Sequence, residues 1–169
     1  MQFDTLYLEL IDSTNMIRSL LQGITDEQAR VRPAADAWSI LEVICHLYDE
    51  EREDFREHLN YILNRGSREW HRIDPQAWVT ARKYNEQEFR DIKEKWLGER
   101  SRSLDWLKSL TTADWDTSCP APFGSLSAGE LFASWVAHDN LHLRQLVELR
   151  RAHIETITKP YSIAYAGDW

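Results

Sequence analysis

The chain has 169 residues, and its 20 basic and 28 acidic side chains give a formal net charge of −8. This length predicts a single domain, residues 1–169, with one buried core. Because the charge is acidic and contains no block of Lys or Arg, neither nucleic acid nor an anionic membrane is an expected partner. No apolar run is long enough to cross a bilayer, and the first ten residues do not resemble a signal peptide, so we expect a cytoplasmic location.

Two helices are predicted in the first third of the chain. Hydrophobic residues at helical spacing predict an amphipathic helix over about residues 3–21. Residues 24–37 are expected to form a connector, because Pro33 blocks helix continuation. Ser39 and Glu42 have the spacing of a capping box, in which side chains of both residues satisfy free backbone N–H groups. The second helix is therefore expected to begin there and to end at about residue 63.

The rest of the chain contains two further helices. Residues 65–84 lack a clean periodicity, and we expect a long connection with at most partial helix that crosses an end of a bundle. Periodicity returns over about residues 86–110 and predicts the third helix. Residues 119–124 include two prolines and are expected to form a loop; no segment shows the alternation of a strand. A second capping box, Ser127 with Glu130, begins the last helix.

The segment after about residue 157 passes through Pro160 into a tail with two tyrosines and a terminal tryptophan. We expect this tail to be extended and packed against the helices. Four helices of roughly 20 residues, a long connection between the second and third, and an extended C-terminal tail predict an all-α four-helix bundle.

Two charged residues fall within apolar stripes, Glu51 in the second helix and Arg100 in the third. A buried charge needs a partner, so these two are expected to pair across the bundle. The alternative is that Arg100 reaches solvent along its own aliphatic stem.

The last helix contains the motif His138-x-x-x-His142. Both imidazoles share a stripe with Trp135 and Leu146 and should face inward. Histidines four residues apart can bind one metal ion, although two hydrogen-bonded core histidines would give the same pattern. A third ligand from the second helix would be either His46 or His58, which lie about 18 Å apart along that helix. Periodicity does not decide between them, because His46 lies on a flank of the apolar stripe.

Two segments, WSILEVICHL at residues 38–47 and AHDNLHLRQL at residues 137–146, resemble the DinB-like (YfiT-like) family of bacterial metal-binding four-helix bundles. The resemblance covers about residues 3–155. In that family one histidine of the second helix and a His-x-x-x-His pair of the last helix bind a divalent ion, usually zinc or nickel. Carried over to this chain, the resemblance implies that the metal ligands are His46, His138 and His142.

The remaining histidines, His58, His71 and His153, are interpreted as surface or packing residues. Three imidazoles leave a coordination position open, as in catalytic zinc sites, where the ion lowers the pKa of a bound water or thiol. Glu50 and Asp139, close to the ligands in sequence, are the expected catalytic or supporting carboxylates, the alternative being ordinary solvated charges.

The resemblance also implies a small-molecule substrate. Some relatives are thiol S-transferases that use a low-molecular-weight thiol, which makes a metal-dependent thiol S-transferase the first hypothesis. A metal-dependent hydrolase is the second, and a non-catalytic metal-binding or stress-response protein is the alternative of another class. Family members are often dimers, so a homodimer is consistent with the resemblance.

Overall fold

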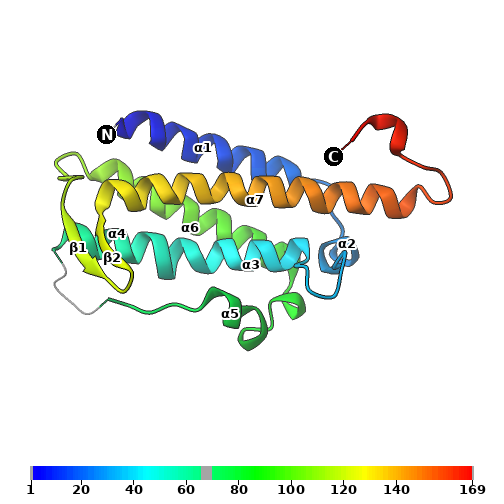
Figure 1. Ribbon diagram of the computed structural model, residues 1–169, viewed down its shortest axis with the longest axis horizontal. Helices are drawn as coiled ribbons and strands as arrows, with labels where there is room; N and C mark the ends of the chain where they lie inside the picture. The colour runs from blue at the N-terminus through cyan, green and yellow to red at the C-terminus, as the bar shows by residue number, and fades with distance from the viewer. Residues whose placement is uncertain (1, 66–69, 169) are drawn as a thin grey trace.

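The structure is a computed structural model that describes residues 2–65 and 70–168, and four long helical segments form its bundle (Figure 1). The second of these segments along the chain consists of two α-helices that a π-helical turn joins without a break. The predicted all-α four-helix bundle is confirmed. The four segments are α1 (Phe3–Leu20), then α3 (Ile40–Glu50) with the π-helix η1 (Glu51–Phe55) and α4 (Arg56–Leu63), α6 (Phe89–Ser109), and α7 (Ala128–Ile157).

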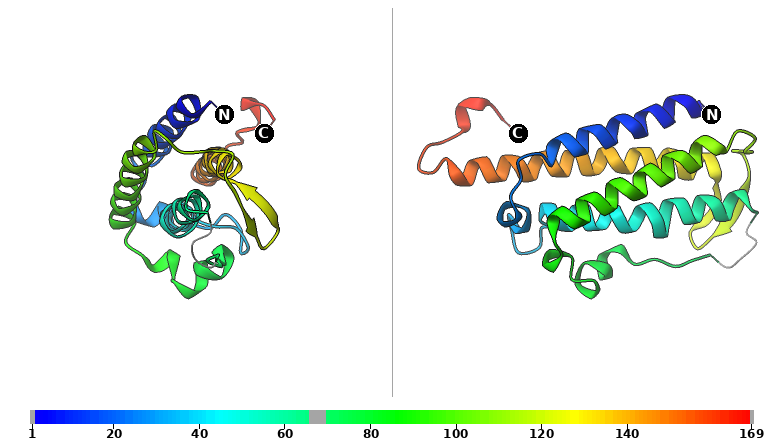
Figure 2. Two further views of the ribbon diagram at one scale, coloured as in Figure 1. Left: turned by 90° about the vertical axis from the view of Figure 1, so that its left-hand side faces the viewer. Right: turned by 180° about the vertical axis from the view of Figure 1, so that it is seen from behind.

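The helices have an arrangement that depends on the long connection. α1 and α7 run in one direction, and α3, α4 and α6 run in the other (Figure 1). α1 and α3 each contact both α6 and α7, and they lie diagonally across the bundle (Figure 2). Because α4 and α6 are parallel, the chain between them must return along the whole bundle. It passes along the outside of α3 instead of crossing an end, so that detail of the prediction is wrong; it contains α5 (Pro75–Ala81) and the 3₁₀-helix η2 (Tyr84–Glu86).

The helix starts agree with the sequence signals. Ser39 and Glu42 form a complete capping box at the start of α3, and Ser127 and Glu130 form another at the start of α7. The connector before α3 contains one short helix, α2 (Asp26–Arg30). Thr25 caps its start, since its side chain accepts a hydrogen bond from the backbone N–H of Gln28. Local hydrogen bonding thus sets where both site-bearing helices begin.

A β-hairpin precedes α7, where the sequence had predicted a loop without strands. Strand β1 (Ser118–Ala121) pairs antiparallel with β2 (Gly124–Ser127). The expectation of a loop without strands is therefore wrong. Pro120 is tolerated in β1 because each strand of a two-stranded sheet has a free edge, so a missing N–H need not interrupt the ladder, and Pro122 lies in the turn. Gly124 has a φ of +129°, which favours glycine at the turn between the strands.

The C-terminal tail turns back beside the end of α7 and contains the 3₁₀-helix η3 (Ala164–Ala166) (Figure 1). Tyr161 and Tyr165 are 80% and 105% exposed, so the expected packing of these tyrosines is wrong. Trp169, the third aromatic residue of that expectation, lies outside the described residues.

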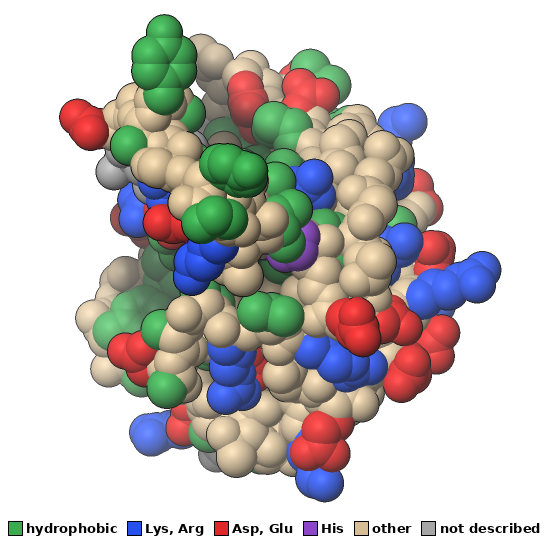
Figure 3. Space-filling view, turned by 90° about the vertical axis from the view of Figure 1, so that its right-hand side faces the viewer, with side chains coloured by type: hydrophobic (Ala, Val, Ile, Leu, Met, Phe, Trp, Pro, Cys, Tyr) green, Lys and Arg blue, Asp and Glu red, His purple; other side chains and the backbone are tan. Residues whose placement is uncertain are grey.

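The surface and the helix lengths bear on contact with membranes. At the end of the molecule where α7 finishes, acidic and basic side chains are interspersed and the surface is hollowed between segments (Figure 3). Within residues 2–65 and 70–168, the helices lack the combination of length and apolarity that a bilayer span requires.

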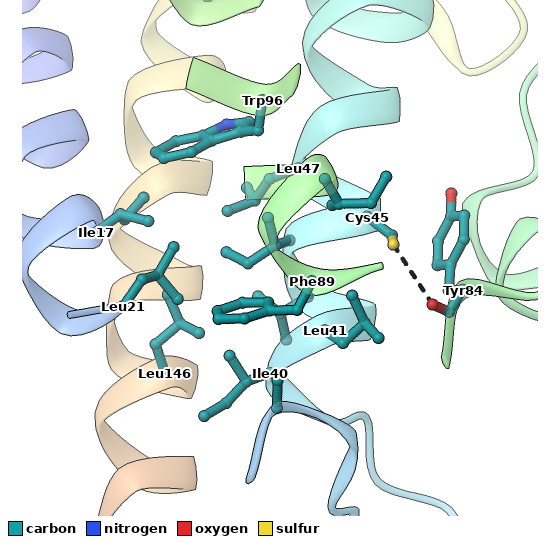
Figure 4. Packing of buried hydrophobic residues seen from close by; sticks show 14 of the residues in the cluster. Ile17, Leu21, Ile40, Leu41, Cys45, Leu47, Tyr84, Phe89, Trp96 and Leu146 are labelled. Carbon is teal, nitrogen blue, oxygen red and sulfur yellow. Dashed lines mark hydrogen bonds between the residues drawn. The ribbon is translucent and has the colours of Figure 1, made fainter. Parts of the chain in front are cut away.

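Two apolar clusters fill the ends of the bundle. One contains Ile17, Leu41, Trp96 and Leu146, and Figure 4 shows its packing, together with the hydrogen bond from Cys45 Sγ to the carbonyl of Tyr84. The other contains side chains from the opposite halves of the same helices. Between the clusters each long segment contributes buried polar residues, which form a polar layer across the middle of the bundle. These residues are Ser13 and Thr14 of α1, His46, Glu50 and Glu51 of the second segment, Arg100 and Ser103 of α6, and Asp139 and His142 of α7.

Candidate metal centre

Three histidine Nε2 atoms converge on one side of the polar layer. His138 Nε2 lies 3.3 Å from His46 Nε2 and 3.1 Å from His142 Nε2, and one ligand atom from each residue falls within 4.8 Å of the others. Two nitrogens bound to a tetrahedral zinc at about 2.0–2.1 Å are about 3.3 Å apart. The structure therefore brings together the three predicted ligands, at a spacing that fits one divalent ion.

The fold places His46 at this point although it lies on the flank of an apolar stripe. α3 is covered by the bundle on one side and contacts α5 and η2 on the other, so nearly its whole circumference is buried. His46 is only 5% exposed. The ring of Trp38 lies 4.9 Å from that of His46, and the ring of Phe55 lies 4.9 Å from that of His138. Aromatic packing thus holds two of the three imidazoles.

Burial favours the uncharged imidazoles that metal binding requires. It is the main cause that lowers the pKa of His46 to about 2 and of His138 to about 4, and the neighbouring histidines lower both further. Burial also lowers the pKa of His142, against the opposing effect of its hydrogen bond to Gln145. All three rings are therefore neutral at pH 7, with a lone pair available to a metal ion.

Gln145 fixes the tautomer of His142. The Nδ1 of His142 lies 2.7 Å from Gln145 Oε1, which can only accept, so Nδ1 carries the proton and Nε2 presents its lone pair to the cluster. This is the arrangement in which protein groups orient metal-binding histidines.

Glu50, one of the two predicted carboxylates, lies behind His46. Its Oε1 is 3.9 Å from His46 Nδ1, on the side of the ring away from the cluster. Burial, followed by a hydrogen bond and the charge of Asp54, raises the pKa of Glu50 to about 9. Glu50 is therefore a neutral acid at pH 7, and its catalytic role stays a prediction.

Asp139 faces the other side of α7, although it follows His138 in the chain. Its two oxygens accept from Arg100 Nη1 and Nη2 at 2.6 and 2.9 Å, and one also accepts from Ser13 Oγ at 2.5 Å. The structure thus brings Asp139 to Arg100 and not to the histidine nitrogens. A catalytic role for Asp139 likewise stays a prediction.

The predicted pair between Glu51 and Arg100 is present. Arg100 Nε donates to Glu51 at 2.9 Å, and Arg100 is 1% exposed, which excludes the alternative in which it reaches solvent. Thr14 Oγ1 accepts a further bond, so all five guanidinium N–H groups are used. Burial acts to lower the pKa of Arg100, but Glu51 and Asp139 raise it above its ordinary value.

A cleft of about 620 Å³ opens over the histidine cluster. Its walls come from the connector before α3, from α5 and from the outer face of α7, so the long connection contributes to the site. The sequence interpretation missed most of these wall residues, because the cleft depends on how the connectors fold. Besides the three histidines, the lining residues are Pro33, Asp36, Ala37, Trp38, Gln76, Leu141, Arg144, Gln145, Glu148 and Leu149.

His58 is buried, as the packing interpretation allows, but it is also firmly hydrogen bonded. Its Nδ1 lies 2.5 Å from Asp54 Oδ1 and its Nε2 lies 2.7 Å from the carbonyl of His71. Burial acts to lower the pKa of His58, but these two bonds raise it above its ordinary value. A signal for this residue is present in the sequence, since His46, Glu50, Asp54 and His58 follow one another at intervals of four.

Comparisons with known proteins identify the family of the chain and a solved structure with a similar fold. A family model described as the DinB superfamily matches residues 9–146. The chain belongs to the DinB superfamily. Among solved structures, YfiT from Bacillus subtilis, described as "a probable metal-dependent hydrolase with an unusual four-helix bundle topology", is similar with a TM-score of 0.77. The two chains are 17% identical, and the match covers 89% of this chain and 86% of YfiT, which shows a shared fold. A search of curated proteins gave no significant match.

Proposed function

We propose that this DinB superfamily protein is a divalent-metal-dependent hydrolase of small molecules. The observation that carries the proposal is the convergence of three neutral imidazole Nε2 atoms at the base of an open cleft. Three histidine ligands with an open position are typical of catalytic zinc sites, and imidazole also suits nickel. The description of YfiT as a probable metal-dependent hydrolase supports the same class.

The residues around the cleft would have separate roles in metal binding and substrate binding. His46, His138 and His142 would hold the ion, and a bound divalent ion supplies Lewis acidity and lowers the pKa of water. Gln145 keeps His142 in the binding tautomer. A cleft of about 620 Å³ fits a small molecule, and Trp38 and Leu141 offer it apolar contact. Neither Glu50 nor Asp139 lines the cleft, so proton transfer by either residue would have to pass through other groups.

The first test is metal content, measured by elemental mass spectrometry on protein purified without an affinity tag. We expect about one zinc or nickel ion per wild-type chain, and loss of the ion in His46→Ala and His142→Ala. His153→Ala is the matched control, because that histidine lies on the same helix away from the cluster. Wild-type protein that neither contains nor takes up a divalent ion would overturn the proposal.

The second test separates hydrolysis from thiol transfer. Metal-loaded protein is incubated with a panel of esters and amides, and in parallel with an electrophile and a low-molecular-weight thiol. Hydrolysis that disappears in His142→Ala would support the proposal. Turnover that requires the thiol would replace it with the thiol S-transferase hypothesis.

A further inference from the structure

Two buried polar atoms face each other behind the metal centre. His46 Nδ1 and Glu50 Oε1 are 3.9 Å apart, and within the described part of the chain neither has a hydrogen-bond partner. A buried polar atom without a partner destabilises the fold, and buried polar groups in native proteins are nearly always hydrogen bonded. A histidine that binds a metal through Nε2 carries its proton on Nδ1, and that N–H needs an acceptor. Glu50 Oε1 is the atom placed to accept it.

His58 and Asp54 hold Glu50 from the other side. The carbonyl of His71 can only accept, so His58 Nε2 donates to it. His58 Nδ1 lies 2.5 Å from Asp54 Oδ1 and carries a second proton, which it donates to this carboxylate. The His58 ring is 1% exposed and stacks on Trp70, with centroids 4.1 Å apart and planes at 10°. His58 is therefore a fixed double donor that anchors the Asp54 carboxylate. Asp54 in turn lies against Glu50 and forms a hydrogen bond with it.

The π-helical turn explains how these four residues align. In an α-helix each step of four residues rotates the side chain by about 40°, so three steps would spread His46 and His58 over about 120°. A π-helix has about 4.4 residues per turn, so a step of four within it rotates the side chain back by about 30°. The π-helix spans Glu51–Phe55, in the middle of the series. It brings the four side chains closer to one line along the helix.

We propose that Glu50, Asp54 and His58 form a chain of positioning residues that orients His46 for metal binding. The proposal rests on the three-histidine metal site of the proposed function. It assigns a role in metal affinity to His58, a residue about 18 Å along the helix from His46 and far from the ion. Groups of this kind typically change metal affinity 10- to 100-fold when removed.

The experiment measures zinc affinity by competition with a chromophoric chelator, and the visible absorption spectrum of the cobalt-substituted protein. We expect Glu50→Leu to weaken zinc binding 10- to 100-fold and to change the cobalt spectrum, because His46 loses its acceptor. Glu50→Gln should retain near wild-type affinity, since its amide oxygen still accepts from His46 and its NH₂ still donates to Asp54. His58→Phe, which keeps the stacking on Trp70, should weaken binding about 10-fold. Glu57→Leu, an exposed carboxylate on the same helix, is the control and should bind as wild type.

The outcomes separate the two proposals. Wild-type protein that binds neither zinc nor nickel overturns the proposed function and this inference together. Wild-type binding that is abolished in His46→Ala but unchanged in both Glu50→Leu and His58→Phe overturns only the inference. Circular dichroism checks folding, and if Glu50→Leu does not fold, His58→Phe decides the question by itself.

Discussion

The polar layer of this bundle contains two clusters that differ in how completely they are bonded. Around Arg100, every guanidinium N–H has an acceptor, and the partners Glu51 and Asp139 are 1% and 0% exposed. Around the histidines, three Nε2 atoms converge and a cleft opens above them. The clusters are neighbours, since His138 and Asp139 are adjacent in the chain, as are Glu50 and Glu51. The closed cluster around Arg100 and the open cluster of the three histidines are therefore only one residue apart along each of these two helical segments.

This difference indicates which buried polar groups are available for function. A cluster whose donors and acceptors are all used has nothing left to bind, and removing one member leaves charges without partners. A cluster of neutral imidazoles beside a cleft can offer nitrogen lone pairs to a ligand. Burial differs in the same sense: Arg100, Glu51 and Asp139 are 1% exposed or less, whereas His46 and His142 are 5% and 6% exposed and His138 is only half-buried. The histidine cluster is therefore the one that a ligand can reach through the cleft.

The largest expected effect comes from breaking the closed cluster. Arg100→Met leaves two buried carboxylates unpaired, and we expect it to lower the free energy of unfolding by about 3–5 kcal/mol. Urea denaturation at pH 7 measures this loss. Arg90→Met, at an exposed position of the same helix, should change stability by less than about 0.5 kcal/mol. Equal effects of the two substitutions would show that the closed cluster does not stabilise the fold.

A second prediction concerns the open cluster in metal-free protein. The pKa of His138 is about 4 in the folded chain, against 6.5 for an ordinary histidine. As pH falls below 6.5 the unfolded chain binds a proton that the folded chain does not, so this residue's contribution to stability is full above pH 6.5 and is lost towards pH 4. Between pH 7 and pH 5 the loss is about 2 kcal/mol.

The measurement must isolate His138, because Glu50 acts in the opposite direction. The pKa of Glu50 is raised to about 9, so its contribution to stability is present at low pH and is lost as pH rises from 4.5 towards 9. Comparing wild type with His138→Gln at each pH removes the contributions that both proteins share. The stability difference should shift by about 2 kcal/mol in favour of the variant between pH 7 and pH 5. A constant difference would mean that His138 is as easily protonated in the folded chain as in water.

The sequence predicted one cluster better than the other for a physical reason. Helical periodicity reports which residues share a face, so it placed His138 and His142 inward and also identified Glu51 and Arg100 as buried charges in need of partners. It could not assign Asp139, because adjacency to His138 in the chain means a rotation of about 100° around the helix. That rotation carries Asp139 from the histidine side of the layer to the Arg100 side.

The position of His46 marks a second limit of sequence reasoning. Periodicity left His46 and His58 as alternatives, and the resemblance selected His46. The structure shows why helical periodicity could not choose between the two histidines. α3 is buried around nearly its whole circumference, so its buried residues do not form a single apolar stripe. The π-helical turn at Glu51–Phe55 then shifts the register of the following helix. Neither the covering connection nor the extra residue in that turn leaves a clear periodic signal.

The smallest expected effect tests whether the open cluster is tuned by single hydrogen bonds. Gln145→Leu removes the acceptor for His142 Nδ1 but leaves all three ligands in place. We expect zinc affinity to fall about 10-fold, because the ring is then free to adopt the other tautomer. Gln145→Glu, which keeps an acceptor, should retain wild-type affinity or exceed it. Chelator competition measures both variants.

The control for this last substitution is Gln76→Leu, because Gln76 also lines the cleft but comes from α5. If Gln145→Leu and Gln76→Leu bind zinc equally well, the hydrogen bond to His142 does not contribute to affinity. The open cluster would then depend on the packing of its rings alone. If only Gln145→Leu is weakened, with an unchanged urea midpoint, the bond acts on ligand geometry and not on the fold. That outcome would place the hydrogen bonds of the open cluster in metal binding, and those of the closed cluster in stability.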